Sequence, residues 1–356
     1  MAALARRDDA DLARGLQAWC GQRWPDAACR VTGMARPSAG WTNETLVVHL
    51  ASDGRVPEQV VVRLPPPVPT WPSYDLAAQA RVLDALAHGP VPVPRVLAFE
   101  ADAGWLGDAF LVMSYEDGHV GGEAPALDAW ITDRPVARQR VLHEAFVDTL
   151  AAVHRFDWRA HGLGDALRGG HRGHGGHGGA TLADEVAWWR DYVDWAADGA
   201  PTAGLADAIT WCAETVPTSD TPRSLCWGDA RIGNVVFTDD GRVRAVLDWE
   251  LAIVGPAESD VAWYLVLDEL TTRFVGRSVP GFLARDELVA HYERQLGREL
   301  VDLPWHELFA LTRSVAINER QARLAQAAGV AYPGVAGDAN PVLRALTTRI
   351  TRFTSG

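Results

Sequence analysis

The chain has 356 residues, enough to bury a large core and to divide into two lobes. Its formal net charge of −13 argues against nucleic acid as a partner, because a phosphate backbone needs a basic surface. The four cysteines form no Cys-x-x-Cys pair, so we expect reduced, buried thiols in a cytoplasmic protein. Residues 1–19 predict an amphipathic helix instead of a signal peptide, and no apolar run is long enough to span a membrane.

The first third of the chain is rich in strand signals. Runs dominated by β-branched and apolar residues occupy 44–50, 59–64, 91–100 and 109–118. A proline-rich connector and a helical pattern over 75–87 lie among them. Helical periodicity takes over from about residue 120, so we predict two lobes of different character, 1–115 and 116–356.

A Gly/His-rich run, GGHRGHGGHGGA, follows within residues 161–180. His171, His174 and His177 are candidate metal ligands, but a glycine-rich segment does not pre-organise them. We therefore expect an exposed loop at this position.

A short hairpin further along the chain is flanked by polar side chains. Val235–Phe237 and Val243–Leu247 are strand-like, and the Asp-Gly pair between them predicts a tight turn. Closing this hairpin brings Asn234, before the first strand, beside Asp248, after the second. An amide oxygen next to a carboxylate suits Mg²⁺. Asp229 lies on the loop that leads into the hairpin, and we expect it to face the same cleft.

These three side chains match the needs of phosphoryl transfer. The reaction requires a carboxylate that orients and deprotonates the attacking hydroxyl, and metal ligands that neutralise phosphate charge. Asp and Asn are also favoured in turns for local reasons, which is the structural alternative. The hairpin, the second aspartate and the β-then-α order together favour the catalytic interpretation.

At these residues the sequence resembles the aminoglycoside phosphotransferase (choline kinase-like) family. WGDARIGNVVF is similar to the family's catalytic loop, usually H-G-D-x-x-x-x-N, and VLDWE is similar to its metal-binding strand end. The likeness continues through GPAESDVAWYL and is closest to a bacterial branch related to the kinase-like domains fused to some acyl-CoA dehydrogenases. It implies an α+β, protein-kinase-like fold, with a small β-rich N-lobe, a larger, mainly helical C-lobe and the active site between them.

The resemblance also implies roles for single residues. Asp229 corresponds to the catalytic base, Asn234 and Asp248 to the Mg²⁺ ligands, and Asp260 to a buried aspartate that braces the catalytic loop. Trp227 stands where the family usually has a histidine that positions this loop.

The N-lobe departs from the family pattern. The chain contains no lysine, so Arg63 occupies the place of the nucleotide-contacting lysine on the third strand. A guanidinium group binds phosphate bidentately and keeps its charge, which suits that role. Gln79 replaces the helical glutamate that pairs with the lysine. An amide can hydrogen-bond a guanidinium, but it forms no ion pair.

The resemblance implies further contacts on both sides of the cleft. Candidate nucleotide-binding residues are Arg63, Ser38, Thr42, Asn43, Ser114 and Tyr115. Ser38, Thr42 and Asn43 belong to the loop over the phosphates, and the backbone at Ser114 and Tyr115 would bond adenine. For Glu250 and Glu258 two interpretations stay open: contacts to the acceptor, or a structural or solvated role.

These features predict a small-molecule kinase that transfers the γ-phosphate of ATP or GTP to a hydroxyl group with Mg²⁺ as cofactor. A catalytically silent nucleotide-binding protein of the same fold is the main alternative. A protein kinase is the weaker one, since no activation segment ending in Ala-Pro-Glu is found. An aminoglycoside, a macrolide-like compound or a hydroxyacyl thioester would suit as acceptor, the first two implying antibiotic resistance. Neither the acceptor nor the oligomeric state follows from the sequence.

Overall fold

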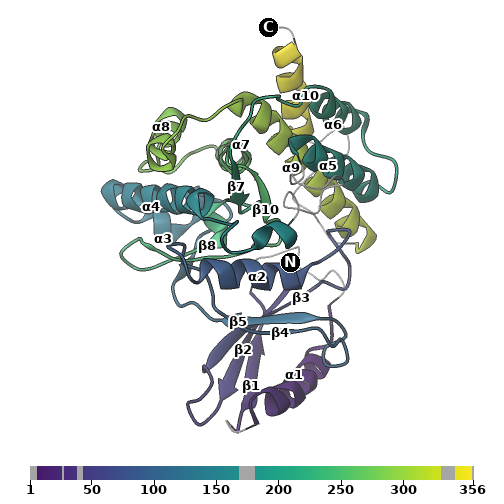
Figure 1. The fold of residues 1–356 in the computed structure, drawn as a ribbon, viewed down its shortest axis with the longest axis vertical. Helices are drawn as coiled ribbons and strands as arrows, with labels where there is room; N and C mark the ends of the chain where they lie inside the picture. The colour runs from purple at the N-terminus through teal and green to yellow at the C-terminus, as the bar shows by residue number, and fades with distance from the viewer. Residues whose placement is uncertain (1–5, 26–27, 38–42, 168–180, 330–340, 355–356) are drawn as a thin grey trace.

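The computed structural model describes residues 6–25, 28–37, 43–167, 181–329 and 341–354, so Ser38, Thr42 and the Gly/His-rich run lie outside the described residues. A β-sheet with two flanking helices forms one end of the molecule, and the larger remainder is mainly helical (Figure 1). This is the α+β architecture that the resemblance implies, with the β-rich and helical parts in the predicted order.

The small lobe is built on a five-stranded antiparallel sheet. Its strands, in order across the sheet, are β1 (Arg30–Ala35), β2 (Glu44–Ala51), β3 (Gln59–Leu64), β5 (Phe110–Ser114) and β4 (Val96–Glu100). Side chains along β2 alternate between buried and half-buried, because successive residues of a strand point to opposite faces. Arg63 therefore lies on a central strand, opposite Thr45 of β2 and Leu111 of β5.

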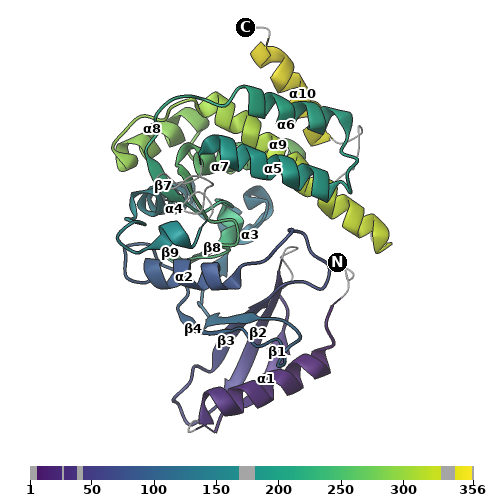
Figure 2. The same cartoon turned by 45° about the vertical axis from the view of Figure 1, so that its right-hand side comes forward.

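Two helices cover this sheet. Helix α1 (Asp9–Arg23) lies along the sheet (Figure 2) and buries an apolar side against it, where Leu12, Leu16 and Trp19 join the core of the small lobe. The carboxylate of Asp8 caps its first turn by accepting the N–H groups of residues 10 and 11. Helix α2 (Leu76–Leu86) is buried between the sheet and the larger lobe and shares that lobe's core.

The larger lobe consists mostly of helices. These are α3 (Ala129–Thr132), α4 (Val136–Arg155), α5 (Leu182–Ala196), α6 (Ala203–Glu214), α7 (Glu258–Val275), α8 (Arg285–Leu296), α9 (Leu303–Ala327) and α10 (Pro341–Thr354), with 3₁₀ turns η2 (Pro125–Leu127), η3 (Leu163–Asp165) and η4 (Ile232–Asn234). The long helix α9 packs against α5, α6, α7 and α10 (Figure 2). No helix in the described ranges has the length and apolar character needed to cross a membrane.

The larger lobe also contains two small sheets. One contains β6 (His119–Val120), β8 (Val235–Phe237) and β9 (Val243–Val246), and the other pairs β7 (Arg223–Cys226) with β10 (Ile253–Pro256). Strands β8 and β9 form the predicted hairpin, with Val235 opposite Val246 and Gly241 at φ +87° in the turn. The four cysteines are buried and free, as predicted.

Candidate active site

The loop after β7 is shaped by a glycine and a buried aspartate. Gly228 has φ +88°, and a Cβ atom there would lie 2.1 Å from the carbonyl oxygen of Leu251, so only glycine fits. Asp260, in the first turn of α7, accepts the N–H groups of Trp227 (2.6 Å) and Gly228 (2.8 Å). Asp260 thus braces the loop as the resemblance implies.

Trp227 connects this loop to the strand end that carries Asp248. Its indole N–H donates to the carbonyl oxygens of Leu247 at 2.7 Å and Asp248 at 3.2 Å. The ring itself is buried and packs near Trp249. Trp227 therefore ties the loop to the end of β9.

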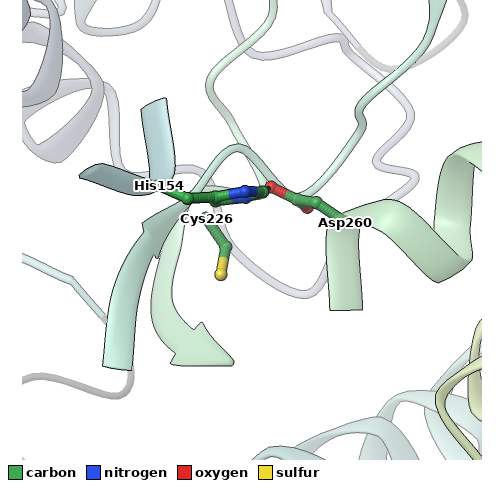
Figure 3. Close-up of side chains that lie close together, drawn as sticks. All are labelled: His154, Cys226 and Asp260. Carbon is green, nitrogen blue, oxygen red and sulfur yellow. Dashed lines mark hydrogen bonds and ion pairs between the residues drawn. The ribbon is translucent and has the colours of Figure 1, made fainter. Parts of the chain in front are cut away.

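His154, Cys226 and Asp260 lie close together behind the loop, in an arrangement that superficially resembles a metal ligand set (Figure 3). The Nε2–H of His154 donates to Asp260 at 2.9 Å, and its Nδ1 contacts the Tyr292 hydroxyl at 2.5 Å. Figure 3 shows the Cys226 sulfur turned away from the carboxylate. Burial raises the pKa of this thiol well above its usual value. The cluster is a hydrogen-bonded brace.

The carboxylate of Asp229 is half-buried and held by three donors. Oδ2 accepts from Asn234 Nδ2 at 2.8 Å and from Arg231 Nε at 3.0 Å, and Oδ1 accepts from Trp263 Nε1 at 2.8 Å. Sequence reasoning missed Arg231 and Trp263. A signal existed for both: Arg231 stands inside the catalytic-loop motif, and Trp263 lies one helical turn after Asp260 on the same helix face.

A cavity of about 490 Å³ lies between the sheet and the larger lobe. Among the residues lining it are the predicted site residues Asn43, Arg63, Ser114, Tyr115, Asn234 and Asp248. Apolar side chains from both lobes, including Val61, Met113 and Val236, form other parts of its wall. The structure therefore brings together residues that are up to 205 positions apart in the chain (43 to 248).

Arg63 is buried and pairs with carboxylates of the larger lobe. Its Nη2 lies 2.6 Å from Asp248 Oδ1 and 4.0 Å from Glu250 Oε2. Burial by itself lowers the pKa of Arg63, but attraction to Asp248 and Glu250 outweighs this, and the pKa is raised overall. Gln79 lines the same cavity, yet no hydrogen bond joins it to Arg63 within the described structure. The Nε of Arg63 is buried and has no partner among the described residues.

Glu250 turns toward the small lobe. Its side chain is 6% exposed, Oε1 accepts from Trp71 Nε1 at 3.0 Å, and Oε2 accepts from Asn43 Nδ2. Together with its proximity to Arg63, these contacts link the strand end after β9 to three segments of the small lobe.

The structure places Glu258 away from the cavity. Its side chain is fully buried, and it accepts from Arg298 at 2.5 and 3.0 Å and from the Val301 N–H at 3.0 Å. Burial raises its pKa, but these donors more than compensate and the pKa is lowered overall. Of the two interpretations left open for Glu258, these contacts favour the structural role over a contact to the acceptor.

Asn234 and Asp248 each retain an oxygen suited to a divalent cation. The Nδ2 of Asn234 donates to Asp229, and Arg63 donates to Asp248 Oδ1. Within the described ranges, no donor contacts Asn234 Oδ1 or Asp248 Oδ2. The N–H of Leu247 donates to the Asn234 carbonyl at 2.8 Å, which sets the two residues at adjacent ends of the hairpin. One amide and one carboxylate oxygen at the edge of this cavity fit Mg²⁺, which keeps other positions for water and phosphate.

The chain is similar to known proteins over most of its length. A model of the "Phosphotransferase enzyme family" matches residues 33–300. "Probable acyl-CoA dehydrogenase IBR3" of Arabidopsis thaliana is 25% identical over 297 residues, covering 78% of this chain and 34% of that protein. "Acyl-CoA dehydrogenase family member 11" of Gallus gallus is 29% identical over 246 residues, covering 68% of this chain and 29% of that protein. The chain spans only about a third of the length of these relatives.

Solved structures share the fold over nearly the whole chain. A Ralstonia eutropha protein provisionally named an aminoglycoside phosphotransferase has a TM-score of 0.67 at 23% identity and covers 94% of both chains. The aminoglycoside phosphotransferase APH(4)-Ia, solved with ADP and hygromycin B, has a TM-score of 0.54 at 16% identity and covers 94% of this chain and 98% of its own. The predicted kinase-like architecture, with a β-rich lobe and a mainly helical lobe, is thus confirmed. Because the family model matches well over half of the sequence, the chain belongs to the phosphotransferase enzyme family.

Proposed function

We propose that the protein is a small-molecule kinase that transfers the γ-phosphate of ATP or GTP to a hydroxyl group. One observation carries the proposal: Arg63, Asn234 and Asp248 line a single cavity, and Asp229 is hydrogen-bonded to Asn234 beside it. Similar folds have been solved with ADP and hygromycin B, and with GDP, which supports a nucleoside triphosphate as donor.

The cavity offers distinct groups to the two ends of a nucleotide. The unpartnered Nε of Arg63 is a buried donor suited to a phosphate oxygen, and Asn43 lies on the same side of the cavity. The N–H of Ser114 already donates to the Arg95 carbonyl, so the base would bond to backbone groups further along, at Tyr115. Mg²⁺ held by Asn234 and Asp248 would neutralise charge on the phosphates.

Asp229 is the proposed general base. Its orientation is fixed by three donors, so its remaining lone pairs can accept the proton of an incoming hydroxyl. The hydroxyl oxygen forms a bond to the γ-phosphorus, the bond from that phosphorus to the β–γ bridging oxygen breaks, and the nucleoside diphosphate leaves. We further propose 1–115 as the nucleotide-binding lobe and 116–356 as the catalytic and acceptor-binding lobe.

The test is a screen for release of ADP or GDP with Mg²⁺ and a panel of hydroxyl compounds: aminoglycosides, macrolides, hydroxyacyl thioesters and common metabolites. Asp229→Asn serves as the catalytic control and should lower turnover by about 10²–10⁴-fold while still binding ADP. Nucleotide binding without turnover of any acceptor would support a silent nucleotide-binding protein. Phosphate transfer only to added proteins would support a protein kinase, and absence of Mg²⁺-dependent nucleotide binding would reject the proposal.

A further inference from the structure

Arg231 contacts the proposed base, but the mechanism proposed above gives it no role. It lies two residues after Asp229, lines the same cavity as Asn234 and Asp248, and bonds two carboxylates with different nitrogens. Its Nε donates to Asp229 Oδ2 at 3.0 Å, and its Nη1 donates to Glu123 Oε2. One guanidinium therefore touches both the proposed base and an acidic residue that also lines the cavity.

The two carboxylates differ in exposure. The Asp229 side chain is 17% exposed and held by three donors, whereas that of Glu123 is 55% exposed. Glu123 lies between β6 and η2, beside Gly233 of the same catalytic loop. Contacts between exposed charges contribute little free energy and exchange readily, so the Glu123 contact is the replaceable one. Although burial lowers the pKa of Arg231, the nearby carboxylates raise it overall, so its charge is permanent.

Geometry limits how far the transferred group can lie from this cation. An attacking hydroxyl that is hydrogen-bonded to Asp229 lies about 3 Å from that carboxylate, and the phosphorus it attacks lies about 3–3.5 Å further on. The Nε of Arg231 is 3.0 Å from the same carboxylate. The guanidinium is therefore within reach of the oxygens on the transferred phosphorus, where negative charge is spread in the transition state.

We propose that Arg231 is a catalytic residue that contacts the γ-phosphoryl group during transfer, and that Glu123 holds its guanidinium while no phosphate is present. This inference rests on the proposed kinase function. When the triphosphate binds, an oxygen of the γ-phosphate replaces the Glu123 carboxylate, which moves into solvent. During transfer the hydroxyl proton goes to Asp229, and Arg231 keeps its protons and only stabilises charge.

The experiment compares Arg231→Gln, Arg231→Lys and Glu123→Gln with a matched control, Arg242→Gln. Arg242 pairs with Asp240 at 3.0 Å at the exposed tip of the same hairpin, so the control removes an arginine–carboxylate pair outside the cavity. Two readouts are needed: steady-state kinetics, and calorimetric affinity for Mg²⁺–ADP with and without aluminium fluoride, which mimics the transferring phosphoryl group. Thermal unfolding checks that each variant is folded.

We expect Arg231→Gln to lower kcat by about 10³-fold and to weaken the aluminium fluoride complex comparably, with the affinity for ADP alone changed less than about threefold. Arg231→Lys should recover part of both losses, because a point charge replaces only part of the planar group. Glu123→Gln should act in the opposite direction and lower the KM for ATP about two- to fivefold, because a competing carboxylate is removed. Arg242→Gln should match wild type.

Three results would overturn the inference. Unchanged affinity of Arg231→Gln for the aluminium fluoride complex would show that Arg231 does not contact the phosphoryl group. Equal loss of affinity for ADP with and without fluoride would make it a ground-state or structural residue. A loss of kcat in Glu123→Gln would show that Glu123 positions the arginine instead of competing for it. Failure of the wild-type protein to bind Mg²⁺–ADP would instead reject the kinase proposal itself.

Discussion

The indole N–H of Trp263 donates a hydrogen bond to Oδ1 of Asp229 over 2.8 Å. Trp263 comes from α7, whose first turn also supplies Asp260 to the catalytic loop. One helix therefore fixes both the backbone of this loop and the side chain of the proposed base. The face of the indole ring lies against the guanidinium of Arg313 from α9, at 4.7 Å, so the donor is itself held in place.

Trp263→Phe should lower kcat by about tenfold or more and leave the affinity for ADP unchanged, because it removes a hydrogen bond to an ionised carboxylate. The control is Trp305→Phe, which removes another buried indole and its hydrogen bond to Thr215 (3.1 Å). We expect the control to lower the melting temperature only. Equal kcat values for the two variants would mean that Trp263 does not orient Asp229.

Asp248→Ala should abolish the Mg²⁺-dependent part of nucleotide binding. The change removes an anionic metal ligand and also leaves Arg63 without its 2.6 Å partner. Differential scanning fluorimetry with ATP, with and without Mg²⁺, measures this. Asp240→Ala at the exposed hairpin tip is the matched control. Stabilisation by Mg²⁺–ATP that survives in Asp248→Ala would contradict the metal assignment.

Arg63→Ala should weaken ATP binding about 10- to 150-fold, the loss expected for a charge-assisted hydrogen bond, and should affect adenosine much less. Arg63→Lys should recover part of the loss, because an ammonium group cannot reproduce the planar guanidinium. Calorimetric titration of both ligands against both variants decides the matter. Equal losses for ATP and adenosine would assign Arg63 to lobe packing instead of phosphate binding.

Glu250→Gln should raise the KM for ATP about tenfold and leave the KM for the acceptor unchanged. The carboxylate contacts Asn43 and lies 4.0 Å from Arg63, so it supports the phosphate side of the cavity. A glutamine still accepts the Trp71 N–H, which preserves the packing. A selective rise in the acceptor KM would favour the acceptor interpretation of Glu250.

Stability should fall as the pH drops from 6.5 to 5, partly because of two buried histidines. Burial lowers the pKa of His143 from 6.5 to about 3 and that of His306 to about 4. Both are neutral in the folded protein but bind protons when it unfolds, so each contributes stability above pH 6.5 that is lost on acidification. The slope of the unfolding free energy approaches about 1.4 kcal/mol per pH unit for each histidine.

His143→Gln should reduce this slope by the contribution of one histidine, whatever its effect on stability at neutral pH. Urea titrations at several pH values between 5 and 7 give the slope. His88→Gln is the control, since His88 is exposed on the protein surface. An identical slope in His143→Gln and wild type would show that His143 titrates equally in both states.

Local sequence patterns were sufficient for the hairpin and for four of the five strands of the N-lobe sheet, whereas β1 was not among the predicted strand runs. The alternation along β2 and the Asp-Gly turn before β9 are properties of neighbouring residues, so the juxtaposition of Asn234 and Asp248 followed from them. The side-chain orientations of Glu250 and Glu258 depend on hydrogen-bond partners that lie 207 and 40 positions away in the chain. A local sequence pattern cannot predict such partners. The contact between Arg231 and Glu123 is equally remote, spanning 108 positions.

The resemblance aligns Arg63 with the family's nucleotide-contacting lysine, and the chain contains no lysine at all. Reagents that acylate or sulfonylate an amine in a nucleotide-binding cavity need a lysine there. The buried guanidinium, whose raised pKa keeps it protonated, is not such a nucleophile. Proteome-wide profiling with these reagents would therefore fail to label this cavity. Dicarbonyl reagents, which react with arginine, are the covalent probes that suit it, and bound nucleotide should protect Arg63 from them.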